Sequence, residues 1–326
     1  MITPAFGITA TERVLPKLAL DFTTASLDPR ITFTRTTGAS NPATYINSSG
    51  VITAATNNQP RFDYDPVTLV CKGLLIEESR TNSLLNTDLL PTQIVTVTAA
   101  TRTLSFYGTG SVTLSGAHAA VVSGTGAYPT RTTYSFTPTA GALTLTVAGT
   151  VQYAQLEAGA FATSYIPTTT TALTRNADVA VMTGTNFSGW FNASEGTYNV
   201  TFSTLPDSTS KAGIPFAMDS GSANGFIVYK NTVNYIVLYA GSNTTALTQI
   251  TNNTLVNVAC SYNNASGVCA KDGSNTSNIT TSGVSTPTTA YFGRNYAGSN
   301  ILNGWIKEVN YWPQKLTSNE VRAFSK

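Results

Sequence analysis

Four runs in the C-terminal half decide the fold, because each is rich in β-branched and aromatic residues and has the length of one strand. They are YNVTFS (198–203), GFIVYK (225–230), NYIVLYA (234–240) and LVNVACSY (255–262). Glycine, asparagine, proline and serine separate these runs, which is typical of strands joined by turns. Asp272-Gly273 is a pair that closes tight hairpins. Residues 179–326 are therefore predicted to form the largest and most regular β unit of the chain.

The same pattern continues upstream in shorter strands. They are TRTLSFYG (101–108), GSVTLSG (110–116), RTTYSFTP (131–138) and ALTLTVAG (142–149). Short strands spaced by roughly 10–15 residues, with turn residues between them, indicate a sandwich. Residues 91–178 are predicted to form a small β-sandwich. The Thr-rich, Pro-bearing stretch 167–174 is interpreted as the linker to the larger unit.

Residues 1–90 contain only isolated strands and a loop-like stretch, NNQPRFDYDP. The apolar residues of this segment are too scattered to form a core alone: Leu18, Phe22, Ile31, Phe33, Ile46, Val51 and Ile52. They need a second surface to pack on. The segment is therefore predicted to be an extended arm that packs on a partner or on sister chains.

Helix signals are scarce. The best is Thr317-Ser318-Asn319-Glu320, a capping box followed by apolar residues at helical spacing, which predicts a short C-terminal helix. EESRTNSLL (77–85) is a weaker second candidate. The chain has three cysteines, of which Cys260 and Cys269 are placed to face each other across a hairpin. The odd count favours free, buried thiols.

Composition limits the function. Charged residues are only 10% of the 326 residues, and 18 Lys and Arg against 16 Asp and Glu give a net charge of +2. This balance predicts no nucleic-acid binding. No apolar span is long enough to cross a membrane. The first residues do not form a signal peptide, so the protein is expected to be made in a cytoplasm.

Catalytic patterns are weak. His118 is the only histidine and no G-x-S-x-G motif surrounds a serine, so a Ser-His-Asp triad is not predicted. Glycoside hydrolysis needs two carboxylates at a set separation. Asp63 and Asp65 could share a strand face, but they precede a proline and are interpreted as turn residues. Glu77 and Glu78 are adjacent and would point to opposite faces of a strand.

Two candidate sites lie in the last segment. Aromatic faces and polar groups bind sugars, and the candidate glycan contacts are Tyr229, Tyr235, Tyr239, Arg294 and Tyr296. Packing or a subunit interface is the alternative for these tyrosines, and Trp305 and Trp312 are interpreted as core residues. Calcium takes oxygen ligands. Its candidate ligands are Asp207, Asp219 and Asn224, although a polar loop is the preferred interpretation and no other cofactor is predicted.

Longer motifs resemble a modular family of bacteriophage tail-fibre and virion surface proteins. In the first segment they are LDPRITFTRTTGAS (27–40), ATYINSSGVI (43–52), PRFDYDPVT (60–68) and GLLIEESRTNSLLN (73–86). In the middle segment they are LSFYGTGSVTLSGAH (104–118), YSFTPTAGALTLTVAG (134–149), AQLEAGAFATSYIPT (154–168) and LTRNAD (173–178). In the last segment AYFGRN (290–295) and GWIKEVNYWPQKLTSNEVRAFS (304–325) resemble the closing strands of a concanavalin A-like or laminin G-like jelly roll.

The resemblance implies an all-β virion component: an extended N-terminal arm, a small sandwich like a short carbohydrate-binding module, and a C-terminal jelly roll. It implies a tail-fibre or baseplate appendage that contributes to recognition of host-surface glycan and carries no enzyme activity. A capsid decoration or head-fibre protein is the alternative, and a polysaccharide depolymerase is a weaker one. Other virion proteins and sister chains, as a homotrimer, are the implied partners, and the virion, released by lysis, is the implied location.

Overall fold

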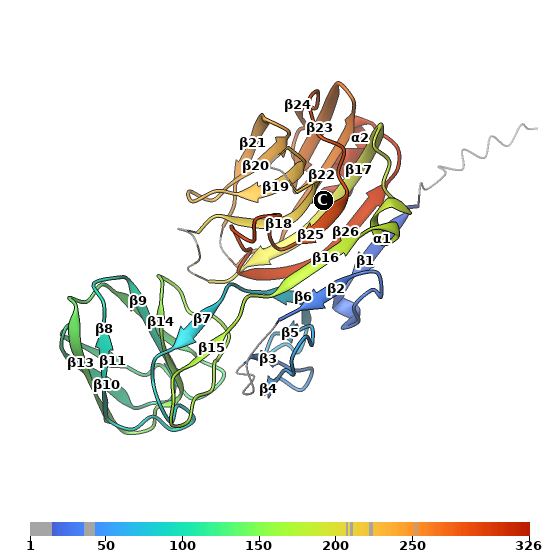
Figure 1. The fold of residues 1–326 in the computed structure, drawn as a ribbon. Coiled ribbons are helices and arrows are strands. Elements are labelled where there is room, and N and C mark those ends of the chain that lie inside the picture. Colours follow the sequence, from blue (N-terminus) through green and yellow to red (C-terminus); the bar gives the residue numbers. More distant parts are fainter. Residues whose placement is uncertain (1–14, 36–42, 207, 209–210, 222–223, 252) are drawn as a thin grey trace, which may run out of the picture.

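The computed structural model describes residues 15–35, 43–206, 208, 211–221, 224–251 and 253–326, and strands dominate it (Figure 1). The prediction of an all-β fold is confirmed. Within the described residues the helices are short: η1 (Phe22–Thr24), α1 (Thr185–Ser188) and α2 (Ser318–Phe324). No helix in these ranges is long and apolar enough to cross a membrane.

The largest unit is a jelly-roll sandwich of two antiparallel sheets. One sheet has the order β24 (Ser277–Thr280), β23 (Ser266–Lys271), β22 (Val256–Asn263), β17 (Glu195–Thr204), β26 (Gly304–Trp312), β6 (Cys71–Ile76) and β5 (Phe62–Tyr64), and β1 (Leu18–Asp21) also pairs with β26. The other has the order β2 (Thr32–Thr34), β16 (Val179–Thr183), β25 (Thr289–Phe292), β18 (Gly213–Asp219), β19 (Phe226–Lys230), β20 (Tyr235–Ala240) and β21 (Asn243–Gln249).

The core of the large sandwich follows from alternation along its strands. In β19, Phe226 and Val228 point into the core, whereas Ile227 and Tyr229 lie on the outer face. Successive strand residues point to opposite faces, so an apolar residue at every second position covers the core side. Burying one such side chain stabilises the fold by roughly 1.5–3 kcal/mol. Trp305 and Trp312 are buried, as expected of core residues.

The N-terminal segment packs on its own chain. β1, β5 and β6 belong to the first sheet of the large sandwich, and β2 pairs with β16 in the second. The sequence predicted an extended arm seeking a partner surface, and the structure corrects where that surface is. The scattered apolar residues Leu18, Phe22 and Phe33 complete the core of the large sandwich. A local pattern shows that a strand needs a partner, but it does not show which strand supplies it.

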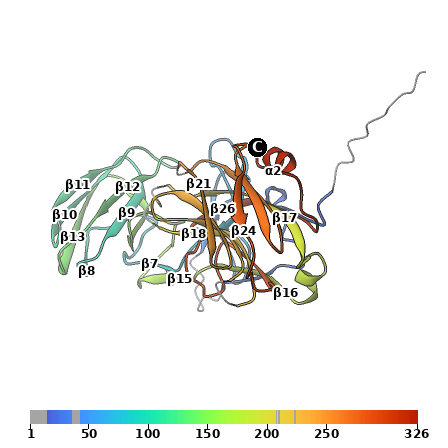
Figure 2. The same ribbon diagram turned by 90° about the horizontal axis from the view of Figure 1, so that it is seen from above.

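The small sandwich stands beside one end of the large one in both views (Figures 1 and 2). One of its sheets has the order β11 (Ala120–Ser123), β10 (Ser111–Gly116), β13 (Gly141–Ala148) and β8 (Gln93–Val97). The other has the order β12 (Thr132–Phe136), β9 (Arg102–Tyr107) and β14 (Gln152–Ala158). Its own core includes Leu104, Phe106, Leu145 and Leu156, so it has the interior of a separate folding unit.

A short ladder lies between the units, where β7 (Arg80–Asn82) pairs with β15 (Leu173–Arg175). In the N-terminal segment β3 (Thr44–Ile46) forms a local hairpin with β4 (Ile52–Ala54). The weak helix signal at 77–85 was wrong, because this stretch contains β7. The predicted linker is not a free tether, because Thr168 is buried and its hydroxyl donates to the Leu84 carbonyl at 2.6 Å. The chain therefore crosses between the units twice through ordered backbone.

The predicted turns and caps are confirmed at the C-terminal end. Thr317 and Glu320 form both hydrogen bonds of the capping box that begins α2. Asp272 and Gly273 both have positive φ, as a tight hairpin turn requires. Cys260 and Cys269 are paired residues of β22 and β23, buried, and both thiols are free.

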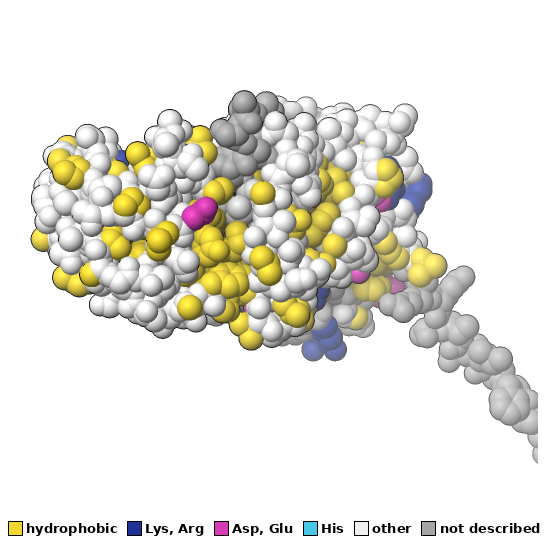
Figure 3. Space-filling model, turned by 90° about the horizontal axis from the view of Figure 1, so that it is seen from below, with side chains coloured by type: hydrophobic (Ala, Val, Ile, Leu, Met, Phe, Trp, Pro, Cys, Tyr) yellow, Lys and Arg dark blue, Asp and Glu magenta, His cyan; other side chains and the backbone are white. Residues whose placement is uncertain are grey.

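Hydrophobic side chains gather at the centre of the lower face, next to the small sandwich (Figure 3). The exposed large apolar residues of the segment that carries β4, β5 and β6 are Val51, Val67, Leu69 and Val70. A Cβ built on Gly50 would meet the Pro66 carbonyl and the Leu69 side chain, so the turns at these two places are in contact. The Tyr128 hydroxyl of the small sandwich also donates to the Gly50 carbonyl.

Candidate functional site

The predicted tyrosine group is partly assembled on the outer face of the second sheet. Tyr229 and Tyr239 lie on the paired strands β19 and β20, with ring centroids 5.6 Å apart in an edge-to-face contact. Tyr291 of β25 joins the same apolar cluster, which rests on Ala217 and Ile227. Sequence reasoning missed Tyr291, although the strand AYF places it one residue before the buried Phe292.

The other predicted glycan contacts lie nearer the edges of this face. Tyr235, at the start of β20, is 40% exposed, and Tyr296, in the loop after β25, is 39% exposed. Arg294 donates from Nε to the Asn295 carbonyl at 3.1 Å, and it interacts electrostatically with Tyr291. The outer face therefore offers a set of aromatic side chains spread over several strands and a loop.

Two of the three candidate calcium ligands lie within the described residues. Asp207 lies outside the described residues. Asp219 is buried at the end of β18, where Oδ1 accepts from the Gly221 amide at 2.8 Å. Burial raises the pKa of Asp219. Asn224 is exposed and uses its carbonyl to accept from the Ser285 amide. In the described part of the chain no group of three or more His, Cys, Asp or Glu side chains is placed to hold a metal ion.

His118 lies in the small sandwich and packs as a structural residue. Its ring stacks on Phe136 with centroids 4.5 Å apart, and Nε2 is 3.0 Å from the Tyr134 hydroxyl. Asp65, the second carboxylate of FDYDP, accepts hydrogen bonds from the amides of Val67 and Thr68. It is therefore the turn residue that the sequence indicated.

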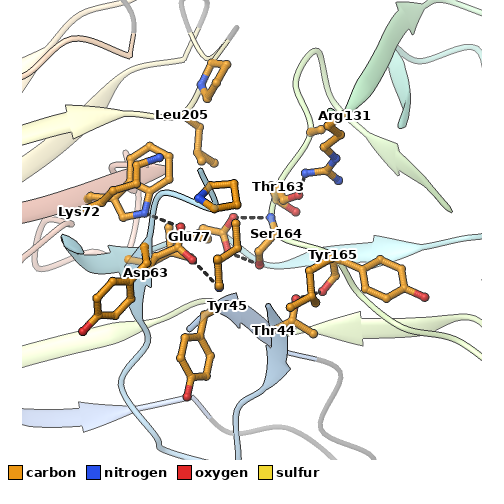
Figure 4. Close-up of a pocket in the computed structure, with 18 of the residues that line it drawn as sticks. Thr44, Tyr45, Asp63, Lys72, Glu77, Arg131, Thr163, Ser164, Tyr165 and Leu205 are labelled. Carbon is orange, nitrogen blue, oxygen red and sulfur yellow. Dashed lines mark hydrogen bonds between the residues drawn. The ribbon is translucent and has the colours of Figure 1, made fainter. Parts of the chain in front are cut away.

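A cavity of about 280 Å³ lies where the N-terminal segment, the small sandwich and the large sandwich meet (Figure 4). We call it the junction pocket. Its lining is mainly aromatic and apolar, with a few charged groups. The lining residues are Thr44, Tyr45, Ile46, Ile52, Asp63, Tyr64, Pro66, Lys72, Leu75, Glu77, Tyr107, Arg131, Thr133, Ala162, Thr163, Ser164, Tyr165, Leu205, Pro206 and Trp305.

One wall of the junction pocket is built from β5, β6 and β26. Asp63 of β5 is buried, and its two oxygens accept from the Ile46 amide at 2.6 Å and from Trp305 Nε1 at 3.0 Å (Figure 4). Lys72 of β6 lies over the other part of the same indole, with Nζ 3.1 Å from the ring centroid. Burial raises the pKa of Asp63 and lowers that of Lys72, because both charged forms lose contact with water.

Glu77 forms the floor together with a buried ionic network. It accepts from Arg61 at 2.7 Å and lies 3.2 Å from Arg175, and Arg61 also contacts Asp178 at 2.5 Å. Ser164, from the loop after β14, donates its amide and hydroxyl to the two oxygens of Glu77. Burial alone would raise the pKa of Glu77, but the two guanidinium groups and the Ser164 hydrogen bonds lower it to about 2.

The small sandwich supplies the opposite wall. Arg131 donates from its two terminal nitrogens to the Thr163 carbonyl at 2.7 Å and to Ser105 Oγ at 2.8 Å. Its guanidinium lies 5.9 Å from the centre of the Tyr107 ring. Tyr165 is fixed by hydrogen bonds to Thr87 and Asp88. Figure 4 shows Arg131 and Lys72 approaching the junction pocket from different sides.

This arrangement suits binding better than acid–base catalysis. Asp63 and Glu77 are the two carboxylates of the junction pocket, and all four of their oxygens accept hydrogen bonds from the protein. Glu77 is also held ionised by two arginines, so it is poorly suited to donate a proton. The aromatic rings and the charged groups of the lining can instead contact and orient a polar ligand.

Sequence reasoning missed the junction pocket because its parts are far apart in the chain. FDYD and GLLIEE were noted for their carboxylates, yet nothing local shows that Asp63 and Glu77 line one cavity. Lys72 lies in CKG, which carries no motif. Strand alternation would have misplaced Lys72: it groups Lys72 with Leu74, which lies in the core of the large sandwich, whereas an irregularity in the pairing of β5 and β6 leaves Lys72 in the pocket with Leu75.

The comparisons with known proteins give structural similarities only. No protein-family model and no curated protein sequence matches this chain. A CBM40 of the Ruminococcus gnavus IT-sialidase, solved with alpha2,3 sialyllactose, aligns at TM-score 0.36 and 12% identity over 43% of this chain and 86% of that chain. A SAP-like pentraxin from Limulus polyphemus aligns at TM-score 0.31 and 14% identity over 41% of this chain and 70% of that chain. These values are too low to assign a family or a function.

Proposed function

We propose that this chain is a non-catalytic bacteriophage virion surface protein that binds glycan of the host surface in the junction pocket. The junction pocket is the observation that carries the glycan-binding part, because it combines aromatic rings with a few fixed polar groups in one concave site. The sequence motifs that resemble tail-fibre and virion surface proteins support the virion part. A tail-fibre or baseplate position is the favoured one.

Both carboxylates of the junction pocket accept hydrogen bonds from the protein, which supports a non-catalytic protein over a polysaccharide depolymerase. A glycoside hydrolase needs one carboxyl group that gives a proton and one that acts as base or nucleophile. Asp63 is held by an indole and an amide, and Glu77 by two arginines and a serine. Neither carboxyl group is therefore available to act as the acid, base or nucleophile.

The test of glycan binding is a saccharide array of host-surface polysaccharides, probed with the wild-type chain and two variants. Thr133→Trp places a large ring in the mouth of the junction pocket, because Thr133 is exposed on β12 and lines it. Thr113→Trp is the matched control, an exposed strand threonine in the other sheet of the small sandwich. We expect Thr133→Trp to weaken binding about tenfold or more, equivalent to about 1.4 kcal/mol, and Thr113→Trp to leave it unchanged.

Equal binding by the wild type and Thr133→Trp would remove the junction pocket as the site, and an array without any signal would reject glycan binding. Antibody labelling of intact particles tests the virion part. Label at the tail or baseplate supports the appendage, label on the capsid lattice favours the decoration protein instead, and particles without label would reject the virion role. Unchanged circular dichroism and melting temperature would show that both variants are folded.

A further inference from the structure

Lys72 is the unusual charge of the junction pocket. It is half-buried in β6, and its Nζ rests on the Trp305 ring, yet it makes no hydrogen bond or ion pair with any described residue. Lys230 shows the contrast, because its buried Nζ donates to carbonyl oxygens of Ser208 and Lys211 and to the Asn234 amide oxygen. A lysine ammonium has three donors. At Lys72 the donors that do not face the indole remain available to a ligand.

The acceptors near Lys72 are engaged elsewhere. Asp63 and Asp65 both lie near enough to influence Lys72 electrostatically. The oxygens of Asp63 accept from Trp305 and Ile46, and Asp65 Oδ1 accepts from two backbone amides of its own turn. Glu77 is neutralised by Arg61 and Arg175. The junction pocket therefore contains carboxylates in its walls but offers a ligand chiefly cationic donors.

Arg131 adds positive potential from the opposite wall. Its guanidinium is fixed by the Thr163 carbonyl and Ser105, both uncharged, and it forms no direct ion pair with a described carboxylate, although the buried Glu157 lies near enough to interact with it electrostatically. Charges in a partly enclosed site interact more strongly than in bulk water. An anion entering between Lys72 and Arg131 would replace part of the solvation that each cation loses through burial.

We propose that the junction pocket selects an acidic saccharide, whose carboxylate accepts hydrogen bonds from Lys72 Nζ while its ring lies among the pocket tyrosines. This inference rests on the proposed glycan binding and adds the chemical class of the sugar. Lys72 is the specificity-determining residue, and the positive charge of Arg131 adds electrostatic attraction for the carboxylate. The cation–π contact with Trp305 holds the ammonium in place before the ligand arrives.

The experiment compares one acidic oligosaccharide, rich in uronic acid, with the same oligosaccharide after its carboxyl groups are reduced to alcohols. Affinities are measured by calorimetry for the wild type, Lys72→Met, Lys72→Arg and Lys17→Met. Methionine keeps a long unbranched side chain over Trp305 without the charge, and Lys17 is an exposed lysine outside the junction pocket. A sulfated neutral oligosaccharide serves as a third ligand.

We expect the wild type and Lys17→Met to bind the acidic form about tenfold or more tighter than the reduced form, since a hydrogen bond to a charged group is lost on reduction. Lys72→Met should lose that preference, and Lys72→Arg should retain part of it. Binding of the sulfated ligand as tight as that of the acidic one would overturn selectivity for the carboxylate.

Two other outcomes separate the two proposals. Equal affinity for the acidic and reduced forms, with binding still blocked by Thr133→Trp, would overturn the acidic-sugar inference and leave the proposed function standing. Absence of binding to every saccharide of the array would overturn both. A preference that survives in Lys72→Met would remove Lys72 as its source.

Discussion

Glu77 links the chemistry of single residues to the stability of the fold. Its pKa is lowered to about 2, from an ordinary 4.5, by Arg175, Arg61 and Ser164, which together outweigh the effect of burial. A carboxyl group whose folded pKa is depressed stabilises the fold at pH values above its unfolded pKa. That contribution, on the order of 3 kcal/mol, is lost as the pH falls from about 4.5 to about 2. Urea unfolding at a series of pH values measures it.

Glu77→Gln tests the same network at neutral pH. Arg175 then loses its ion pair and Arg61 keeps only Asp178, which also binds Arg35, and breaking a buried pair costs roughly 3–5 kcal/mol. The variant should also lose part of the acid-induced slope. Glu308→Gln, a half-buried glutamate of β26 that contacts Asn310, is the control and should change stability little. A loss below about 1 kcal/mol in Glu77→Gln would contradict the importance of the network.

At the scale of elements, the sequence predicted strands and turns well because their signals are local. The runs at 198–203, 225–230 and 234–240 lie within β17, around β19 and around β20, and the capping box begins α2. The pairing of these strands with β1, β2 and β6 was not predictable. In β1, Leu18 and Leu20 are buried and Ala19 is exposed. Such alternation in the sequence shows that one face of a strand packs on a core, but it does not show which sheet edge the strand pairs with.

The same limit explains the candidate site. Tyr229 and Tyr239 were both among the predicted glycan contacts, and the contact between their rings follows from the hairpin of β19 and β20. The junction pocket depends on contacts between residues such as Asp63 and Trp305, which are 242 positions apart. Single-sequence reasoning contains no information on contacts of that range, so Lys72 and Arg131 were not candidates.

β1 provides the test of whether the N-terminal segment acts within its own chain. Leu20 is 3% exposed and is paired with Val309 of β26, so Leu20→Ala should lower the free energy of unfolding by about 2–5 kcal/mol. Leu15→Ala is the matched control, because Leu15 is 75% exposed and should change stability by less than about 0.5 kcal/mol. Urea unfolding at two protein concentrations is the measurement.

The concentration dependence separates packing within one chain from packing on a sister chain. If β1 covers its own sandwich, the loss in Leu20→Ala is the same at both concentrations. A midpoint that rises with protein concentration would mean that β1 packs in trans. An unchanged midpoint in Leu20→Ala would contradict the buried position of this side chain.

At the scale of the molecule, the ionic network lies where all three parts of the chain meet. Arg35, Arg61 and Glu77 come from the N-terminal segment, and Arg175 and Asp178 from the strand region that leads into the large sandwich. Arg175 also donates to Ser164 at 2.9 Å, in the loop that leaves the small sandwich, and to the Glu78 carbonyl at 2.8 Å. The small sandwich has its own core, so its attachment depends on contacts of this kind.

Removing Arg175 should therefore uncouple the units. In differential scanning calorimetry we expect the wild type to unfold in one transition, because breaking the network exposes buried charge in both units at once. Arg175→Met should divide this into two transitions, one for the small sandwich and one for the large. Arg322→Met, an exposed arginine of α2, is the control and should keep a single transition. Two transitions already in the wild type would show that the units fold independently. One sharp transition in Arg175→Met would show that the remaining contacts, among them the hydrogen bond from Tyr128 to Gly50, are enough to couple the two units.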